Sequence, residues 1–477
     1  MDKKFYITTT IPYVNAAPHI GFALEIVQAD AVARYKRLIG YEVFFNFGSD
    51  EHGQKIWQNA TQAGKTPQEY VDEYAAKFKA LKEKLDLSYD AFIRTTDPKH
   101  KAAAQEFWRR CLAAGDIYKK NYQIKYCVGC ELEKSDSELV DGKCPLHPNL
   151  TIELIDEENY FFKLSKYQDA LSELYKRTDF VVPDYRLNEM RSLVKEKGLQ
   201  DFSISRLKSK MPWGVEVPED SEHVLYVWFD ALVNYISTLG WPSDGAKFTK
   251  FWTGTPDTVQ VAGKDQVRQQ ATMWQAMLMS AQLPLTGKIF IHGFINSGGQ
   301  KMSKSLGNVI DPIVIVDEYG VDALRYFLLR HIHPTEDSDF TMERFKDAYN
   351  ADLANGLGNL ASRIMTLAQT HLPEPVKVEF VPYPEEFTSA LDRFEINKAA
   401  EYIWGRIAAL DQRIAAEAPF KVVKEDVELG RAMIVELVKE LAAIDLMLEP
   451  FMPQTSKKII EAIMANKKPE NLFPRKD

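Results

Sequence analysis

The sequence predicts a doubly wound parallel α/β fold that is split by a small metal-binding insertion and followed by an all-α helical bundle. Three observations predict it. Short buried strands alternate with helices as far as about residue 348, which is typical of parallel sheets. Residues 116–224 interrupt this alternation with a cluster of cysteines. From residue 349 onward, amphipathic helical stretches joined by Pro-rich loops replace the strands.

The chain begins with a strand, a turn of small residues and a helix. Residues 5–10 alternate large and hydroxylic side chains, which favours a strand. Apolar residues then recur at helical spacing over residues 20–38, and Gly40 stands where helices commonly end. The free N–H groups and positive end of this helix could hold a phosphate close to Gly21, and His19 could donate a hydrogen bond to it. The same histidine could instead simply cap the helix.

A second buried strand is predicted over residues 41–47, and the loop GSDEHG follows it. Because parallel strands end at the same edge of a sheet, Asp50 would lie beside the first turn, where open sheets bind ligands. A carboxylate at this place can hold an amino group. Capping of the next helix by Asp50 or Glu51 is the alternative. Residues 66–85 and 99–114 are predicted helices, and residues 92–97 a strand ending in a turn.

The insertion holds three of the four cysteines. Cys127, Cys130, Cys144 and His147 have the spacing C-x2-C-x13-C-x2-H. Three thiolates and one imidazole complete a tetrahedral zinc shell without an open position, so we expect one structural Zn²⁺ that holds a small hairpin. Three buried thiols and an unrelated histidine are the alternative. Cys111 stands alone on a helical pattern and is expected to be buried.

The second half continues the strands. Residues 224–229, 259–262 and 289–294 are predicted strands. The stretch Lys301-Met302-Ser303-Lys304-Ser305 follows, flanked by glycines at 298, 299 and 307, which indicates a cationic flap. On its own, this stretch could be a solvated basic turn.

Composition limits the partners. The net charge is −9, so nucleic acid must be bound by local patches. No apolar run reaches the roughly 18 residues of a membrane span, and the N-terminus enters a strand without a secretory signal. We therefore expect a cytoplasmic protein without membrane contact.

The segments PHIG (residues 18–21) and KMSKS (301–305) together resemble the two signatures of class I aminoacyl-tRNA synthetases. PYVNAAPHIG, FIRTTDP, the zinc knuckle, LQDFSISR, YVWFDALVNY, HGFINSGGQKMSKSLGN and NLASR are all similar to the methionyl-tRNA synthetase family, over essentially the whole chain. The resemblance implies a Rossmann-type catalytic domain in two halves, 1–115 and 225–287. It further implies a connective insertion with the zinc knuckle (116–224), the KMSKS flap and linking region (288–348) and a helical anticodon-binding domain (349–477).

In that family, methionine attacks the α-phosphate of Mg²⁺-bound ATP, pyrophosphate leaves, and the methionyl group passes to the 3′ end of tRNA(Met), for translation initiation and elongation. The resemblance implies three groups of site residues. The catalytic residues would be His19, Lys301 and Lys304. The ATP site would comprise His19, Gly21, Gly263, Asp265 and Lys304. The methionine site would comprise Ile11, Tyr13, Asp50, Trp228, Ala231, Leu232, Tyr235, Gln270 and Trp274.

The apolar and aromatic part of this pocket suits a polarizable thioether, although buried aromatics are commonly plain core residues. In the helical domain, the resemblance implies that Asn359 and Arg363 contact anticodon bases and that Phe420 stacks on one. We expect a monomer, because no further tRNA-binding domain follows the bundle.

Three positions depart from the family pattern. Phe22 replaces a second histidine, Gln269-Gln270 replaces an aromatic residue and a histidine in the amino-acid pocket, and Phe420 replaces a tryptophan. The glutamine pair puts the pocket geometry in doubt more than the substrate.

Other functions stay open from the sequence alone. These are a class I synthetase for another apolar amino acid or for cysteine, a non-catalytic RNA-binding protein on a synthetase scaffold, and a nucleotidyltransferase that adenylates a small acid. The closed zinc shell argues against the cysteine enzyme. The lysine flap and Asp50 argue against a pure binding protein, and the helical domain argues against an enzyme that acts without tRNA.

Overall fold

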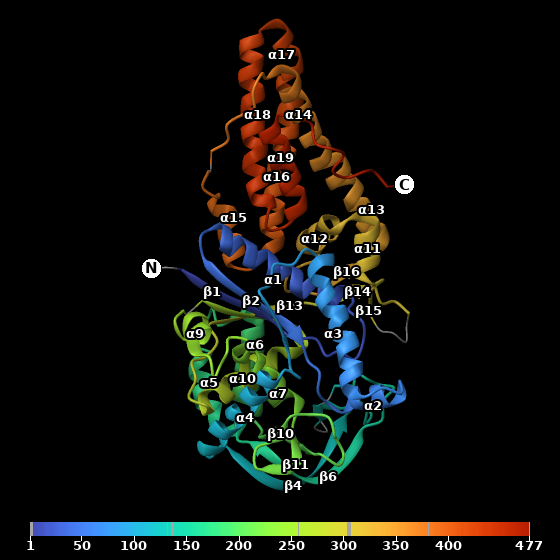
Figure 1. Cartoon of the computed structure of the whole chain (residues 1–477), viewed down its shortest axis with the longest axis vertical. Coiled ribbons are helices and arrows are strands. Elements are labelled where there is room, and N and C mark those ends of the chain that lie inside the picture. The colour runs from blue at the N-terminus through green and yellow to red at the C-terminus, as the bar shows by residue number, and fades with distance from the viewer. Residues whose placement is uncertain are drawn as a thin grey trace. The chain divides into compact units, whose positions relative to one another are not determined.

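The computed structural model describes residues 3–130, 132–134, 138–255, 257–302, 307–379 and 381–476. The chain forms two compact units, and it passes between them several times (Figure 1). The first unit comprises Met1–Pro18, Gly40–Lys82 and Tyr89–Ile291. The second comprises His19–Ile39, Glu83–Ser88 and His292–Asp477. The first long helix thus belongs to the same unit as the C-terminal helices.

A six-stranded sheet lies at the centre of the first unit, in the order β3-β2-β1-β12-β13-β7. The pairs β1–β2, β1–β12, β2–β3 and β7–β13 are parallel. The strand order reverses between β1 and β12, which is the signature of a doubly wound sheet. This confirms the predicted fold class. The strands are β1 (Lys4–Thr9), β2 (Glu42–Ser49), β3 (Ala91–Arg94), β7 (Val181–Val182), β12 (Thr258–Gly263) and β13 (Lys288–His292).

The predicted strand at residues 224–229 is wrong. Its first residues end β11 (Asp220–Leu225), which pairs antiparallel with β9 (Ser205–Leu207) and β10 (Glu216–Val217). The remainder opens helix α7 (Val227–Leu232). A short apolar run fits a buried strand and a buried helix equally well, so periodicity could not separate the two.

A second sheet carries the metal-binding insertion, in the order β5-β4-β6-β8. Its long hairpin pairs β4 with β6 in antiparallel register from Ile117–Phe162 to Tyr126–Glu153. The strands are β4 (Ile117–Cys127), β5 (Leu132–Lys134), β6 (Glu153–Phe162) and β8 (Phe202–Ser203). The helices of this unit are α2 (Gln54–Gln62), α3 (Pro67–Lys84, whose end lies in the second unit), α4 (Pro98–Ala113), α5 (Gln168–Leu174), α6 (Asp184–Ser192), α7, α8 (Asn234–Ser237), α9 (Gly245–Phe248) and α10 (Trp274–Ser280).

The second unit contains helix α1 (Ile20–Leu38), a small sheet and the helical bundle. Helix α1 ends where predicted, and Gly40 follows with a φ of 87°. Within the described residues, no strand follows β16, which confirms the all-α C-terminal region. The small sheet is formed by β14 (Ile295–Ser297), β15 (Gln300–Lys301) and β16 (Ser338–Phe340). The helices are α11 (Pro312–Tyr319), α12 (Val321–Arg330), α13 (Met342–Ala348), α14 (Asn359–His371), α15 (Glu385–Asp392), α16 (Ile396–Glu417), α17 (Pro419–Glu425), α18 (Val427–Leu448) and α19 (Pro453–Ala465).

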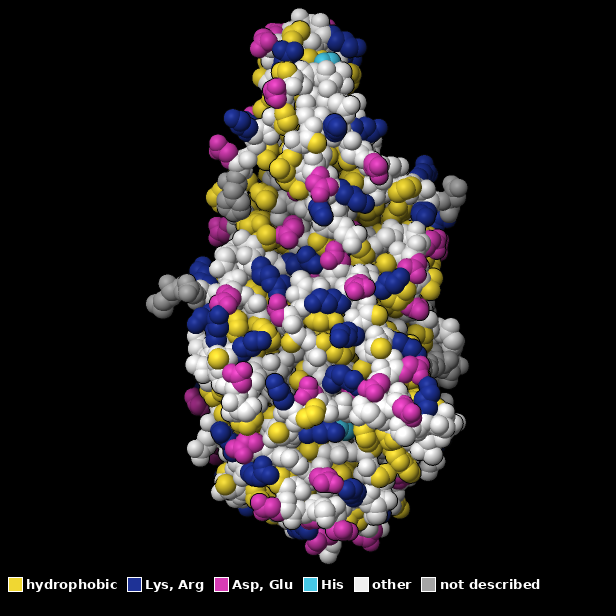
Figure 2. Space-filling model, viewed as in Figure 1, with side chains coloured by type: hydrophobic (Ala, Val, Ile, Leu, Met, Phe, Trp, Pro, Cys, Tyr) yellow, Lys and Arg dark blue, Asp and Glu magenta, His cyan; other side chains and the backbone are white. Residues whose placement is uncertain are grey.

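The surface carries both signs of charge. On the face seen in Figure 2, Lys and Arg side chains are interspersed with Asp and Glu side chains. How a nucleic acid would be held on this surface stays a prediction. Among the described residues, no helix is long and apolar enough to cross a membrane.

Candidate active site and metal centre

The start of α1 is built around His19. His19 is the N-cap residue, and its Nδ1 accepts a hydrogen bond from the Gly21 N–H at 3.1 Å. The capping alternative is therefore correct as a local description. It does not remove a chemical role, because a neutral imidazole whose Nδ1 accepts carries its hydrogen on Nε2 and can donate from there. A Cβ on residue 21 would lie 2.8 Å from Cε1 of His19. The observed position of the His19 ring therefore requires a glycine at residue 21.

The expectation of free N–H groups at this helix start is wrong. The Ile20 N–H donates to the Ile310 carbonyl at 3.0 Å, and the Gly21 N–H donates to His19. The Phe22 N–H donates to the His19 carbonyl at 3.0 Å. The sequence could not show this, because Ile310 lies far along the chain. An anion at this end would be attracted by the helix dipole and by side chains.

The described flanks of the KMSKS stretch (residues 301–305, the lysine-bearing segment) meet this helix start within the second unit. Ile310, just after the segment, accepts from Ile20, and Cε of Met302 lies 3.9 Å from where a Cβ of Gly21 would stand. The backbone of Lys301 lies in β15. Residues 303–306, and with them the predicted catalytic Lys304, lie outside the described residues. Both described flanks of the segment are thus close to His19 and Gly21.

Asp50 follows the end of β2 in the first unit, and its side chain is buried. Its N–H donates to the Pro12 carbonyl at 2.9 Å, and its carbonyl accepts from Val14 at 3.1 Å. Tyr13 is therefore bridged to Asp50 in parallel register. The geometry brings two predicted methionine-site residues, Tyr13 and Asp50, side by side.

Neither Asp50 nor Glu51 caps the next helix. The N-cap residue of α2 is Gly53, and no side chain caps this end. Glu51 is instead a buried structural carboxylate, because Arg94 donates to both of its oxygens, at 2.6 and 2.8 Å. Ser49 and Thr96 add hydroxyl donors. The two adjacent carboxylates therefore have different tasks, since Glu51 ties β2 to β3.

The predicted aromatic pocket residues lie together in the first unit. The Tyr235 ring meets the Trp274 ring edge-on, with centroids 5.8 Å apart. Tyr235, Trp274 and Leu232 belong to the large hydrophobic core, and Trp228, which is partly exposed, packs against that core. Ala231 is buried on α7, between Trp228 and Leu232. The aromatics are thus core residues, and contact with a ligand remains a prediction.

The predicted zinc ligands form one cluster. Their four ligand atoms all lie within 4.8 Å of one another. His147 Nδ1 lies 3.2 Å from Cys130 Sγ and 3.8 Å from Cys127 Sγ, and the Cys130 and Cys144 sulfurs are 3.4 Å apart. A zinc tetrahedron with Zn–S bonds of about 2.3 Å has edges of about 3.7 Å, so the residues fit this ion. A Cβ on Gly129 would lie 2.5 Å from the His147 ring.

Comparison with known proteins decides the family. A family model described as class I tRNA synthetases (M) matches residues 5–151 and 148–365. The methionine–tRNA ligase of Thermotoga maritima is 42% identical over 98% of this chain and 76% of its own length, and that of a Nostoc species is 41% identical over 97% and 90%. The chain belongs to the methionine–tRNA ligase family. The methionyl-tRNA synthetase of Mycobacterium tuberculosis, solved with methionyl-adenylate, superimposes with a TM-score of 0.89 at 36% identity, over 100% of this chain and 99% of that one.

The departures from the methionine–tRNA ligase pattern have local partners. Gln270 is buried, and its Nε2 donates to the Tyr235 hydroxyl at 2.7 Å. Gln269 is buried beside it in the same π-helical turn, Gln269–Met273. The ring of Phe22 lies 4.4 Å from the His19 ring, so the phenylalanine supports the imidazole by packing. Gln270 thus orients the Tyr235 hydroxyl with an amide, which does not titrate, where the family pattern has a histidine.

A buried network beside the predicted pocket was missed from the sequence. Asp230 on α7 accepts from His52 Nδ1 at 2.6 Å and from His100 Nε2 at 2.9 Å, and His100 also contacts the Ser237 hydroxyl at 2.8 Å. Burial alone would raise the pKa of Asp230, but the two histidines hold it well below its usual range. The network joins the helix of Trp228 to the loop of Asp50. His100 and His52 lie 130 and 178 residues before Asp230 in the chain, so no local sequence pattern links them to it.

The predicted ATP-site and anticodon residues have the following places. Gly263 ends β12, and Asp265 is exposed in the turn after it. Asn359 opens α14, and Arg363 follows one turn later, paired with Asp411 of α16. Phe420 lies on α17 with 41% of its surface exposed. The Arg363 pair was not anticipated, and a base would have to compete with Asp411 for this guanidinium.

Removing the metal is expected to release about one zinc per chain and to loosen residues 127–150, because ligand binding and hairpin folding are coupled. Metal analysis and hydrogen exchange after chelation measure both effects. Cys130→Ala should lose the zinc as well, whereas Cys111→Ala should retain it, since Cys111 is buried elsewhere. A metal-free native protein with unchanged exchange over this hairpin would contradict the assignment.

Proposed function

We propose that this chain activates methionine with Mg²⁺-bound ATP and then transfers the methionyl group from the adenylate to the 3′-terminal ribose of tRNA(Met), with release of AMP. The observation that carries the proposal is the meeting of the α1 start with the chain just after the lysine-bearing segment, through the Ile20–Ile310 hydrogen bond of 3.0 Å. A histidine donor, with lysines supplied by the neighbouring segment, would suit a triphosphate whose charge changes during reaction. The similarity of the chain to methionine–tRNA ligases supports methionine and tRNA(Met) as the substrates.

The first step forms an O–P bond and breaks another. A carboxylate oxygen of methionine attacks the α-phosphorus, and the bond from that phosphorus to the oxygen bridging the β-phosphate breaks. Pyrophosphate leaves with the bonding electron pair, and Mg²⁺ would offset the negative charge of the phosphates. His19 Nε2, Lys301 and Lys304 would donate to phosphate oxygens, while Gly263 and Asp265 would hold the nucleotide. No covalent enzyme intermediate is required, so positioning and charge stabilisation supply the rate enhancement.

Methionine would be held at two ends. Asp50 would pair with its ammonium group beside Tyr13. The thioether would lie among Ile11, Trp228, Ala231, Leu232, Tyr235 and Trp274, where sulfur gains from aromatic neighbours. The Tyr235 hydroxyl, oriented by Gln270, would face the sulfur as a weak donor. Discrimination against other amino acids would then rest on this pocket.

Recognition of tRNA would use the helical bundle. Asn359 and Arg363, four residues apart on α14, would address anticodon base edges, and Phe420 would stack on an unpaired base. Because Arg363 is paired with Asp411, we expect base recognition to be coupled to the opening of that ion pair. We further propose that the chain acts as a cytoplasmic monomer, which light scattering would support with a mass near 54.5 kDa.

Pyrophosphate exchange into ATP, measured separately with each of the twenty amino acids, tests the proposal. We expect methionine alone to support rapid exchange, and charging of tRNA(Met) to follow. Exchange with another apolar amino acid would identify a different class I synthetase. Absence of exchange together with tRNA binding would favour the non-catalytic RNA-binding alternative.

A further inference from the structure

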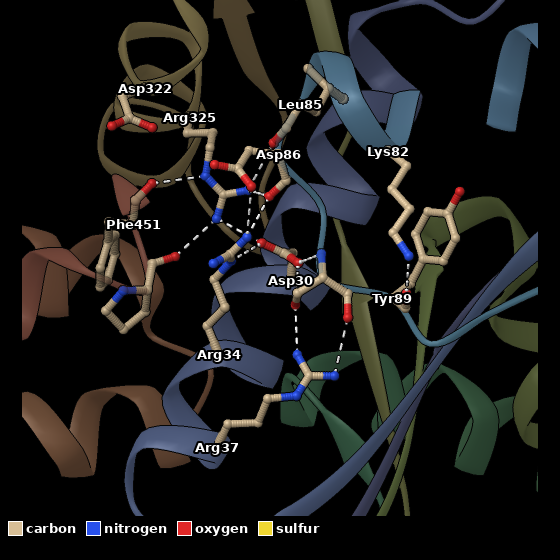
Figure 3. A network of polar contacts seen from close by, with 12 residues as sticks. Asp30, Arg34, Arg37, Lys82, Leu85, Asp86, Tyr89, Asp322, Arg325 and Phe451 are labelled. Atoms are coloured by element: carbon tan, nitrogen blue, oxygen red, sulfur yellow. Dashed lines mark hydrogen bonds and ion pairs between the residues drawn. The ribbon is translucent and has the colours of Figure 1, made fainter. Parts of the chain in front are cut away.

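A buried carboxylate lies in the middle of α1, about three turns after its start (Figure 3). Asp30 Oδ2 is 2.8 Å from Nε of Arg34 and 2.8 Å from Nη2 of Arg325. Its Oδ1 accepts from the N–H and the hydroxyl of Ser88, at 2.6 and 2.7 Å. Burial would raise the pKa of Asp30, but the two arginines and Ser88 lower it. The carboxylate is thus charged and fully surrounded by donors.

Arg325 of α12 joins this carboxylate to distant parts of the second unit. Its side chain is completely buried. Nε donates to the Phe451 carbonyl and Nη2 to the Pro450 carbonyl, both at 2.9 Å, and Nη1 donates to the Leu85 carbonyl at 3.2 Å. One guanidinium therefore connects α1, the loop after α3, and the turn between α18 and α19 (Figure 3). A planar fork with five donors can do this, and a lysine cannot.

Helix α12 has a second link to the bundle. Asp322, one turn before Arg325, accepts from the Thr455 N–H near the start of α19, at 2.5 Å. Arg34 differs from Arg325, because its contact with Asp30 lies within α1 itself. Among the described residues, the other hydrogen bonds of Arg34 go to Asp86 in the loop after α3. Of the two ion pairs of Asp30, only the one with Arg325 links α1 to α12.

Two polar contacts link α1 to the described chain between the lysine-bearing segment and the end of α12. The first is the hydrogen bond between Ile20 and Ile310, at the start of α1. The second is the ion pair between Asp30 and Arg325. The two α1 residues are ten positions apart, which corresponds to about 15 Å along a helix. The outer contact is a single backbone hydrogen bond, whereas the inner one is buried and satisfied on all sides.

We propose that the Asp30–Arg325 pair is the fixed anchor that holds Ile310, and with it the described chain just after the lysine-bearing segment, against the start of α1, so that Arg325 is a positioning residue for adenylate formation. This inference rests on the function proposed above. Groups that act on a nucleotide near the start of α1 need a rigid base, because small misplacements of catalytic groups lower the rate strongly. The anchor also ties this base to the α18–α19 turn of the bundle.

Two matched variants test the anchor. Arg325→Lys and Arg34→Lys make the same substitution at the same distance from the same carboxylate. At a temperature where circular dichroism shows both to be folded, we expect Arg325→Lys to lower kcat of methionine-dependent pyrophosphate exchange about 10- to 100-fold. KM for methionine should change less than about two-fold, since the anchor contacts none of the proposed methionine ligands. Arg34→Lys should keep kcat within about two-fold of the unchanged protein.

Hydrogen exchange at the Ile20 amide gives a readout that does not depend on activity. We expect exchange there to speed up in Arg325→Lys and not in Arg34→Lys, because only the first variant releases α12 from α1. Ser88→Ala, which removes one donor to Asp30, is the second variant should Arg325→Lys fail to fold, and it should show the same change in weaker form.

Three results would overturn the anchor: unchanged kcat in folded Arg325→Lys, an equal loss of kcat in Arg34→Lys, or unchanged Ile20 exchange in both Arg325→Lys and Ser88→Ala. A failure of the proposed function is distinguishable from these. In that case the unchanged protein would not exchange pyrophosphate with methionine, while the Ile20 measurement would still decide whether the anchor exists.

Discussion

Replacing Lys304 with alanine is expected to slow methionine-dependent pyrophosphate exchange by at least about ten-fold, because removal of one group that stabilises developing charge commonly costs this much or more. The flanks of its segment lie against the start of α1, where Ile310 accepts from Ile20. We expect a lysine in this segment to contact phosphate oxygens near His19. The rate should fall in kcat at saturating ATP and methionine, since the proposed interaction would strengthen as pyrophosphate departs.

Lys439→Ala is the matched control for Lys304→Ala. Lys439 is exposed on α18 and paired with Glu436 within its own helix, so its loss should leave exchange unchanged and cost only a few tenths of a kcal/mol of stability. Equal rates for Lys304→Ala and the unchanged protein would refute the role of the flap.

Replacing Asp50 with asparagine is expected to raise KM for methionine roughly 100-fold while the protein stays folded. An asparagine has the same shape but cannot neutralise an ammonium group, and the loss of one partner of a buried charge pair costs about 3 kcal/mol or more. The backbone of Asp50 would stay in place, because its hydrogen bonds to Pro12 and Val14 use main-chain atoms. Exchange kinetics over a range of methionine concentrations measure the effect.

Glu51→Gln gives the opposite signature at the neighbouring position. Its carboxylate is bound by Arg94, Ser49 and Thr96, so the substitution should lower the free energy of unfolding by about 3 kcal/mol, the cost of breaking a buried pair. KM for methionine should change little. If Glu51→Gln raised this KM and Asp50→Asn did not, the two assignments would have to be exchanged.

The alternation of strands and helices could be predicted because each element carries its own signal. The strands β1, β2, β3, β12 and β13 are short apolar or β-branched runs bounded by turn residues, and α1 shows a helical period. Two features had no such signal. Strand β7 is only two residues long, and helix α7 begins in an apolar run that reads equally well as a strand.

The candidate site divides in the same way. Asp50, Tyr13 and the zinc ligands stand in short motifs whose spacing already restricts their chemistry. The structure places Tyr13 beside Asp50 and, separately, gathers the four zinc ligands into one cluster. The hydrogen bond from the Ile20 N–H to the Ile310 carbonyl joins residues that are 290 positions apart. It therefore could not be predicted from the sequence around either residue. The histidines around Asp230 and the arginines around Asp30 are likewise long-range contacts made by burial, which local patterns do not encode.

The central claim is that an early helix start and a late lysine-bearing segment serve one ATP molecule together with methionine. A crystal structure with methionine and a non-hydrolysable ATP analogue tests it most directly. We predict one analogue whose phosphate oxygens lie within about 3.2 Å of both His19 Nε2 and Lys304 Nζ. A nucleotide bound away from the α1 start, or one that only one of these two side chains reaches, would contradict the claim.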